Sequence, residues 1–145
     1  MKLQNCDQTQ IMQVLNRILE LEMAGVVRYT HYSFMVYGHS RIPITKWLAE
    51  QAQESLMHAT RVGEMITHFE GHPSLSIGEL LETHQHDINS ILDESLEHEQ
   101  NGLELYYQLL ELTKDRCVIL EEFAREMIVE EENHMGEVEK MMRKP

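Results

Sequence analysis

Long stretches of helical periodicity, separated by a few short breaks, constrain the fold of this chain most. The 145 residues include only three prolines and seven glycines, and turn-forming residues cluster at 38–43, at 70–73 and, more weakly, at 113–116. Between these breaks apolar residues recur with a period near 3.6, and no strand pattern stands out. We predict helices at 9–37, 44–69, 77–112 and 117–142. Four such helices form an all-α four-helix bundle, expected as one domain spanning 1–145.

The lengths of the connections limit how these helices are arranged. The first and last connections are short, so helices one and two, and helices three and four, should be antiparallel neighbours. The stretch 70–76, which contains the apolar Leu75, has two possible paths. It either crosses the length of the bundle between helices two and three, or joins them as a short link in an up-down-up-down bundle.

Polar residues interrupt the apolar stripe of each predicted helix near its middle. The clearest case is Glu131 with His134, because positions three apart share one face of a helix. A carboxylate and an imidazole on a buried face are costly unless they are paired or bound to metal. The stripes of the other three helices are interrupted by Glu22, by Ser55 with His58, and by Glu99.

Interruptions at mid-length would meet in one layer of the bundle. Three buried carboxylates cannot remain ionised together without cations, and two divalent metal ions would balance them. Oxygen-rich ligation suits iron or manganese better than structural zinc. The alternative is a set of unrelated core or surface residues, with Glu22 paired to a nearby arginine and Glu99 part of a solvated acidic run. The candidate ligands are Glu22, His58, Glu99, Glu131 and His134.

Composition excludes several classes of function. The net charge of −13 and the pI near 5.0 argue against nucleic acid and anionic membranes as partners. No apolar run approaches the roughly 20 residues of a membrane span, and no signal peptide is apparent. We therefore expect a cytoplasmic protein. The two cysteines, Cys6 and Cys117, suggest neither a disulfide framework nor a thiolate metal site.

Four blocks of sequence, one on each predicted helix, carry a resemblance to a known family. They are Leu21-Glu22-Met23-Ala24 with Tyr29, His58-Ala59-Thr60-Arg61 followed by Glu70-Gly71-His72-Pro73, Leu96 to Glu99 with Asn101-Gly102, and Glu131-Glu132-Asn133-His134. Together they resemble the bacterioferritin branch of the ferritin-like superfamily over nearly the whole chain. The resemblance implies a ferritin-like four-helix bundle with a long crossover between helices two and three.

The same resemblance implies roles for the candidate ligands. It implies two iron ions per subunit, with manganese or zinc as possible alternatives, and oxidation of ferrous iron by dioxygen or peroxide. It also implies a homo-oligomer that stores the ferric product. The implied terminal ligands are Glu22 with His58 for one iron and Glu99 with His134 for the other. The resemblance also implies that Glu131 bridges both irons and that the Tyr29 hydroxyl steadies the glutamate of the third helix.

The chain departs from the family pattern at three points. Ser55 stands where the family has its second bridging glutamate, and Glu54 is the tentative replacement. Leu56 stands where the family has its haem-binding methionine, so no haem is expected. The sequence ends at 142–145 without room for the family's fifth helix. This predicts a smaller cage like that of the miniferritins, or a simple dimer.

These departures leave three functions open. The leading hypothesis is a di-iron ferroxidase with a role in iron storage or detoxification. One alternative is a metal-sequestering or structural subunit whose di-metal site is impaired by Ser55. The other is a peroxide-scavenging di-metal oxidase. Outside this centre, His84 and His86 are either surface metal contacts or ordinary solvated residues, with the second reading preferred.

Overall fold

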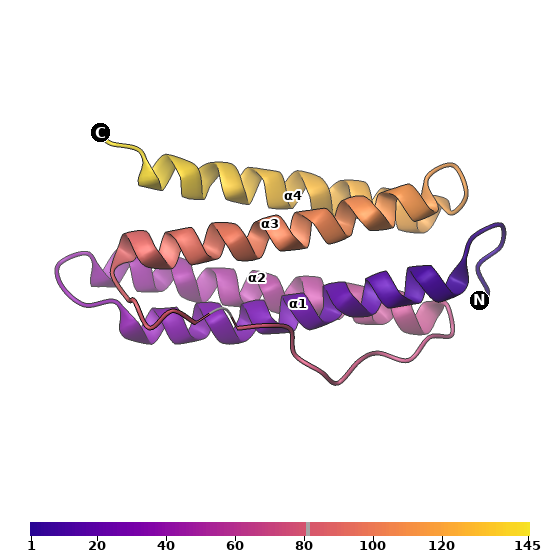
Figure 1. Cartoon of the computed structure of the whole chain (residues 1–145), viewed down its shortest axis with the longest axis horizontal. Helices are drawn as coiled ribbons and strands as arrows, with labels where there is room; N and C mark the ends of the chain where they lie inside the picture. Colours follow the sequence, from indigo (N-terminus) through magenta and orange to yellow (C-terminus); the bar gives the residue numbers. More distant parts are fainter. Residues whose placement is uncertain (81) are drawn as a thin grey trace.

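Four long helices make up the regular secondary structure of the residues described by this computed structural model, 1–80 and 82–145. They lie side by side in one bundle (Figure 1). The prediction of an all-α four-helix bundle is confirmed. In chain order the helices are α1 Gln8–Met35, α2 Arg41–His68, α3 Ile88–Thr113 and α4 Val118–Met142.

Local sequence signals explain where three of the helices begin. Asp7 caps α1, because its carboxylate accepts a hydrogen bond from the Gln10 backbone N–H at 3.1 Å. Asp87 caps α3 in the same way through the Ser90 backbone N–H, also at 3.1 Å. Such caps satisfy a backbone donor that has no partner inside the helix. Pro43 lies in the first turn of α2, where a missing N–H costs nothing.

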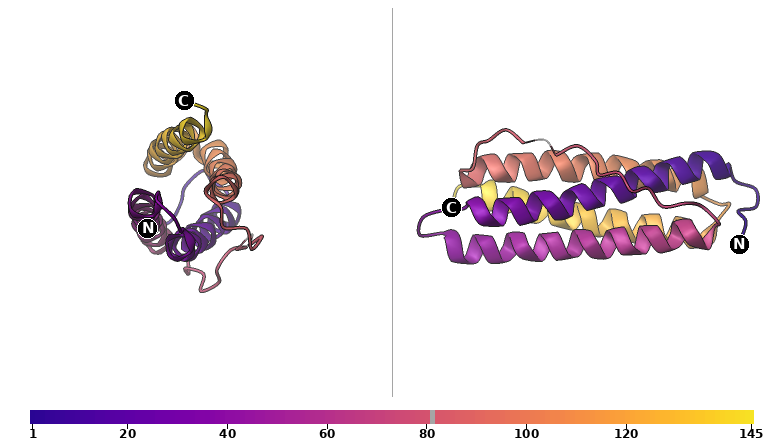
Figure 2. Two further views of the ribbon diagram at one scale, coloured as in Figure 1. Left: turned by 90° about the vertical axis from the view of Figure 1, so that its left-hand side faces the viewer. Right: turned by 90° about the horizontal axis from the view of Figure 1, so that it is seen from below.

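The connection between α2 and α3 runs along the whole bundle, beside α1 (Figures 1 and 2). As a result α2 and α3 are parallel, whereas α1 with α2 and α3 with α4 are antiparallel. The long crossover is confirmed, and the up-down-up-down alternative is wrong. The two ends of the described chain lie at opposite ends of the bundle (Figure 1).

The predicted start of the third helix, at residue 77, is wrong, because α3 begins at Ile88. The physical reason is reach. The 26 residues of α3 make a helix about 39 Å long, whereas a connector of residues 70–76 spans at most about 25 Å. The residues after 76 are therefore needed to complete the crossover. One of them bonds to α1 through its backbone, because the Gly78 N–H donates to the Glu20 carbonyl at 2.9 Å.

Two apolar clusters flank the middle of the bundle. The larger contains Ile18 of α1 and Val62 of α2, and the smaller contains Tyr32 of α1 and Leu48 of α2. The polar interruptions fall between these clusters along the helices. Full burial of each large apolar side chain contributes about 1.5–3 kcal/mol, and this offsets the cost of holding polar groups in the layer between them.

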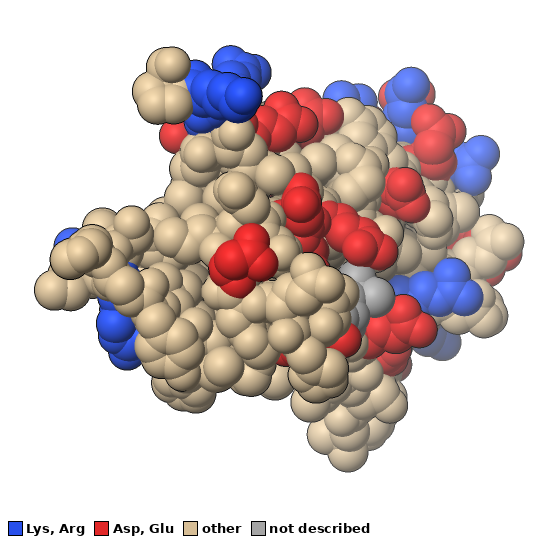
Figure 3. Space-filling model, turned by 60° about the vertical axis from the view of Figure 1, so that its left-hand side comes forward, with Lys and Arg blue, Asp and Glu red and all other residues tan. Residues whose placement is uncertain are grey.

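The surface is dominated by negative charge. On the face in Figure 3, acidic side chains gather near the middle, and Lys and Arg side chains lie toward the edges. A negative field of this kind attracts cations and repels polyanions. None of the described helices combines the length and the apolar character needed to cross a membrane.

Candidate metal centre

Three buried side chains from three helices form the first half of the polar layer. They are Glu22 on α1, His58 on α2 and Glu131 on α4. The Nδ1 atom of His58 lies 3.5 Å from Glu22 Oε1 and 3.5 Å from Glu131 Oε1. Ligand atoms bound at about 2.1 Å to one ion lie roughly 3.0–3.4 Å apart. The spacing of these three atoms is therefore close to that of ligands sharing a single metal ion.

The second half of the layer is formed by Glu99 on α3 and His134 on α4. The His134 Nε2 atom lies 3.6 Å from Glu99 Oε1. Trp47 of α2 stacks on the His134 ring, with centroids 5.8 Å apart and planes 3° apart, and this contact fixes the ring orientation. Glu131 is the carboxylate shared between the halves, because it contacts His58 on one side and raises the pKa of Glu99 on the other.

Two buried ligand-type atoms of this layer have no hydrogen-bond partner. They are Glu131 Oε2 and His134 Nε2. Buried polar atoms are almost always satisfied, and an unsatisfied one costs about 1–3 kcal/mol. A cation between the two halves would satisfy both atoms, so the residues present fit a metal centre.

The electrostatics of the layer support the same fit. Burial raises the pKa of Glu22, and burial together with Glu131 holds the pKa of Glu99 well above its usual range. Burial lowers the pKa of His58, but Glu131 and Glu22 outweigh this effect and raise it to about 11. Without metal the layer therefore retains protons that divalent cations would displace.

Each single glutamate accepts a hydrogen bond from a tyrosine. The Tyr29 hydroxyl donates to Glu99 Oε1, the contact that the resemblance implies. The Tyr106 hydroxyl donates to Glu22 Oε1 at 3.0 Å, a contact that sequence reasoning missed. The signal was available, because Tyr106 follows Glu99 by the same seven residues that separate Tyr29 from Glu22. Tyr29 of α1 therefore bonds to a carboxylate of α3, and Tyr106 of α3 bonds to a carboxylate of α1.

Two further carboxylates approach the other nitrogen of His58. Its Nε2 lies 2.8 Å from Glu130 Oε2 and 3.8 Å from Glu54 Oε1. Both glutamates are part-exposed, at 37% and 39%. Glu54 thus lies near His58, but on the side of the ring away from Nδ1. Glu130 was missed because the sequence pattern draws attention only to Glu131.

Ser55 lies at the wall of the centre. It is buried and lines a small cavity of about 10 Å³ together with Gln51, Glu54, His58, Glu99, Glu131 and His134. That volume is about the size that one water molecule needs.

Behind Ser55, α1 comes close to α2. A Cβ atom on Gly25 would lie 2.7 Å from Ser55 Oγ and 3.0 Å from His98 Nε2. A larger residue at position 25 would therefore crowd the centre.

A second buried polar network lies beside the centre. The Tyr32 hydroxyl donates to Glu94 Oε2, and Arg28 Nη2 donates to the Glu94 carbonyl at 3.1 Å. Arg28 therefore bonds to α3, and the alternative of a surface pair with Glu22 is not observed. Glu94 is buried, unlike the solvated residue that an acidic run suggests. Burial, Arg28 and His134 together lower the pKa of His98 to about 3, so its ring is neutral.

Sequence comparison gives the family of the chain. The ferritin-like domain family matches residues 12–145. The chain belongs to the ferritin-like domain family. No curated protein matches the chain in sequence.

Solved structures agree with this fold. A ferritin-like, diiron-carboxylate protein from Bacillus anthracis superposes with a TM-score of 0.88 at 20% identity, covering 93% of this chain and 96% of that one. A dodecameric thioferritin, the bacterioferritin-related protein from Bacteroides fragilis, gives a TM-score of 0.86 at 21% identity, with 93% and 85% covered. The Rhodobacter capsulatus bacterioferritin, described with a metal-free dinuclear site and haem iron, gives 0.80 at 20% identity, with 97% and 85% covered. At these identities the likeness shows a ferritin-like fold.

Proposed function

We propose that this ferritin-like protein is a di-iron ferroxidase of the bacterioferritin type, which oxidises ferrous iron for storage or detoxification. The observation that supports this most is the pair of His–carboxylate half-sites meeting at Glu131. The unpartnered Glu131 Oε2 and His134 Nε2 atoms lie within that meeting point. The B. anthracis neighbour, described as a diiron-carboxylate protein, adds support from the same fold.

In this proposal Glu22 and His58 hold one iron, Glu99 and His134 hold the other, and Glu131 bridges them. Iron is both the occupant of the centre and the substrate. Two ferrous ions would become ferric and supply two electrons, and solvent would supply two protons, to reduce dioxygen to hydrogen peroxide or hydrogen peroxide to two water molecules. Manganese and zinc are alternative occupants, because the same oxygen and imidazole donors bind them.

The other residues of the layer orient these ligands. The two phenols, Tyr29 and Tyr106, donate to the terminal carboxylates and fix their rotamers. Glu130 is placed to accept a hydrogen bond from His58 Nε2–H, which would keep the proton on Nε2 and leave the Nδ1 lone pair free for a metal. Carboxylates behind ligating histidines commonly set the tautomer and orientation in this way. The apolar clusters on either side limit water access.

The second candidate function is metal sequestration without efficient oxidation, and Ser55 favours it. A serine cannot supply the anionic bridge that a glutamate would. Glu54, the tentative replacement, approaches the Nε2 atom of His58 and also lines the cavity of the centre, so it is the nearest carboxylate that could take over the role of the missing bridge. A peroxide-scavenging oxidase is the third candidate and uses the same ligands.

Anaerobic ferrous titration followed by exposure to dioxygen tests the proposal. We expect two irons per chain and rapid formation of ferric iron. A Glu131→Gln variant should lose both, whereas Glu132→Gln, which removes a neighbouring exposed carboxylate, should behave as the wild type. Binding of iron without oxidation would overturn the ferroxidase proposal in favour of sequestration. Rapid peroxide consumption without mineral formation would favour the scavenging oxidase.

A Ser55→Glu variant tests the missing bridge. We expect metal affinity to rise, because the new carboxylate would face both ions from the wall of the cavity. Unchanged or weaker metal binding would mean that another residue already supplies the bridging carboxylate. In that case Glu54→Gln should lower the metal affinity.

We further propose that residues 1–145 act as one cytoplasmic domain that assembles into a homo-oligomer without haem. The dodecameric neighbour from Bacteroides fragilis supports assembly. Leu56, at the family's haem-ligand position, has no sulfur to offer to haem iron. Light scattering of the purified protein and its visible absorption spectrum test these two expectations.

A further inference from the structure

A second group of metal-ligand side chains lies outside the centre, where the crossover meets α1. His31 of α1 approaches Glu82 and His86 of the crossover, and the donor atoms of all three lie within 4.8 Å of one another. The carboxylate lies between the two rings, with Glu82 Oε2 3.0 Å from His31 Nε2 and 3.5 Å from His86 Nε2. The centroids of the two imidazole rings are 5.5 Å apart.

These separations match ligands on one ion. Bonds of about 2.1 Å place neighbouring ligand atoms roughly 3.4 Å apart in a tetrahedron and roughly 3.0 Å apart in an octahedron. The two measured contacts of Glu82 fall at 3.0 and 3.5 Å. Both histidines present the same atom, Nε2, toward the same carboxylate oxygen. The three side chains can therefore close on one ion with small rotamer changes.

One atom points to a ligand independently of this spacing. The Nε2 atom of His86 is buried and has no hydrogen-bond partner, although Glu82 lies beside it. Buried polar atoms are almost always satisfied, and a cation between this nitrogen and the carboxylate would supply the missing partner.

A partly apolar cavity adjoins the group. Its volume is about 220 Å³, and it is lined by the apolar Val27 and Leu80 together with His31 and Glu82. Arg28 also reaches this cavity, where its Nη2 donates to the Tyr32 hydroxyl and the Glu94 carbonyl, each at 3.1 Å, and its Nε and Nη1 are buried without a partner. The His31 and Glu82 side chains are 45% and 25% exposed, so an ion can reach the group from solvent.

We propose that His31, Glu82 and His86 form a second metal site, which binds one divalent transition-metal ion and ties the crossover to α1. Two imidazoles and one carboxylate suit Fe²⁺, Co²⁺ or Zn²⁺, whereas Ca²⁺ and Mg²⁺ prefer ligation by oxygen alone. Three protein ligands leave coordination positions open to solvent. The site shares no residue with the centre at Glu131, so it stands whether or not that centre oxidises iron.

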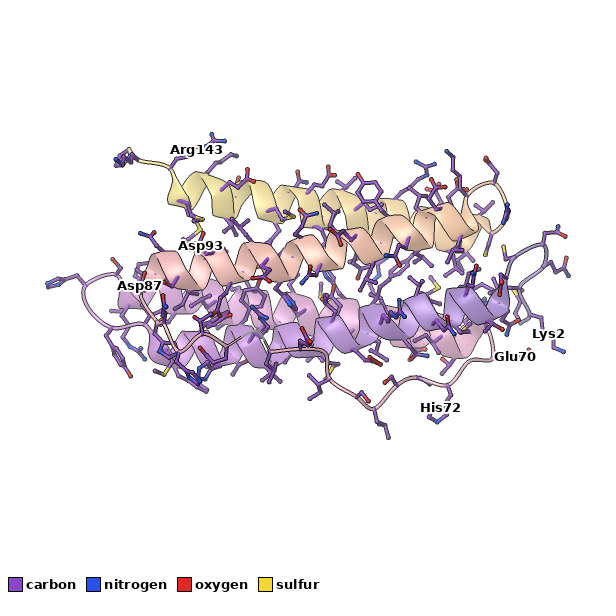
Figure 4. The ribbon with its side chains drawn as sticks, in the orientation of Figure 1. Lys2, Glu70, His72, Asp87, Asp93 and Arg143 are labelled. Atoms are coloured by element: carbon purple, nitrogen blue, oxygen red, sulfur yellow. The ribbon has the colours of Figure 1, made fainter. Side chains whose placement is uncertain are left out.

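Cobalt binding by the full chain tests this site. Equilibrium dialysis against Co²⁺ should show that the His31→Gln/His86→Gln double variant binds one ion fewer per chain than the wild type. His72→Gln is the matched control, because His72 is an exposed crossover histidine that points away from the helices (Figure 4). It should bind as the wild type does. A Glu131→Gln/His134→Gln variant should retain the crossover ion, which separates the two sites.

Two further measurements keep the result unambiguous. Crystals grown with Co²⁺ should show an anomalous peak within bonding distance of the three side chains. Co²⁺ should also slow chymotryptic cleavage after the exposed Leu75 and Leu80 in the wild type and not in the double variant. Equal Co²⁺ binding by the double variant and the His72→Gln control would overturn the proposal. So would an anomalous map with a peak at the centre and none at the crossover.

Discussion

Glu130 provides a sharp test of how the centre is organised, because it contacts His58, a proposed ligand, without being one of the five proposed ligands itself. Its carboxylate lies 2.8 Å from His58 Nε2, whereas Nδ1 of the same ring faces Glu22 and Glu131. In the proposed centre Glu130 accepts a hydrogen bond from the Nε2–H of His58 and so fixes both the tautomer and the ring angle. Glu130→Gln keeps the size of the side chain but removes the charge that holds this arrangement.

The expected loss of metal affinity depends on how exposed Glu130 is and on the nearby carboxylate of Glu54. Loss of a partner behind a metal ligand typically lowers metal affinity by about 10–100-fold. Glu130 is 37% exposed, so solvent screens its charge. Glu54, at 3.8 Å from the same nitrogen, can partly replace it. We therefore expect about a tenfold loss, about 1.4 kcal/mol, for Glu130→Gln and a loss nearer to 100-fold for Glu54→Gln/Glu130→Gln.

Anaerobic Fe²⁺ titration with a competing chelator measures this effect for each ion. The loss should fall on the ion that His58 would hold, because Glu130 bonds to His58, whereas His134 would hold the other ion in the proposed centre. Glu132→Gln is the matched control, since it removes one carboxylate from the same run, where Glu132 accepts from Tyr107 at 2.9 Å. Equal affinities for the Glu130 and Glu132 variants would refute the reasoning. So would equal weakening of both ions, because that pattern indicates a general loss of negative charge.

Three further predictions follow from the structure. Tyr106→Phe removes the phenol that donates to the α1 carboxylate at 3.0 Å and should weaken one ion by about tenfold, whereas Tyr29→Phe should weaken the other, as the same titration will show. Gly25→Ala would place a Cβ 2.7 Å from a serine hydroxyl on α2, so urea unfolding of the metal-free protein should show a loss of about 1–2 kcal/mol; Gly63→Ala, with nothing within 4 Å, should instead gain up to about 1 kcal/mol, and equal effects would contradict the packing argument. Metal binding at pH 7 should release protons, because the pKa of His58 is raised to about 11 and a ligand must be unprotonated; apparent affinity should therefore rise with pH, and calorimetry that shows no proton release in buffers of different ionisation enthalpy would contradict this.

Local sequence determined most of the helical framework. Apolar periodicity and turn residues place α1, α2 and α4 within a few residues of their observed ends, because helix pattern and capping are properties of neighbouring residues. The start of α3 was decided by tertiary structure. The sequence from 77 to 87 has helix-compatible side chains, but the crossover has to span the bundle, and Gly78 takes its backbone partner from Glu20 of α1.

The centre divides in the same way. The sequence predicted five residues of the centre, because a polar residue in the middle of an apolar helix stripe can be recognised from the sequence alone. These residues are Glu22, His58, Glu99, Glu131 and His134. The structure brings all five into one layer. Their role as ligands remains a proposal.

The partners of these residues come from other helices, and sequence did not reveal them. Tyr106 donates across the bundle to α1, and Glu130 reaches His58 from α4. The group of His31, Glu82 and His86 depends even more on the fold, because it forms only where the crossover lies along α1. Helical periodicity fixes which face a side chain occupies, but the packing of separate segments decides which side chains meet.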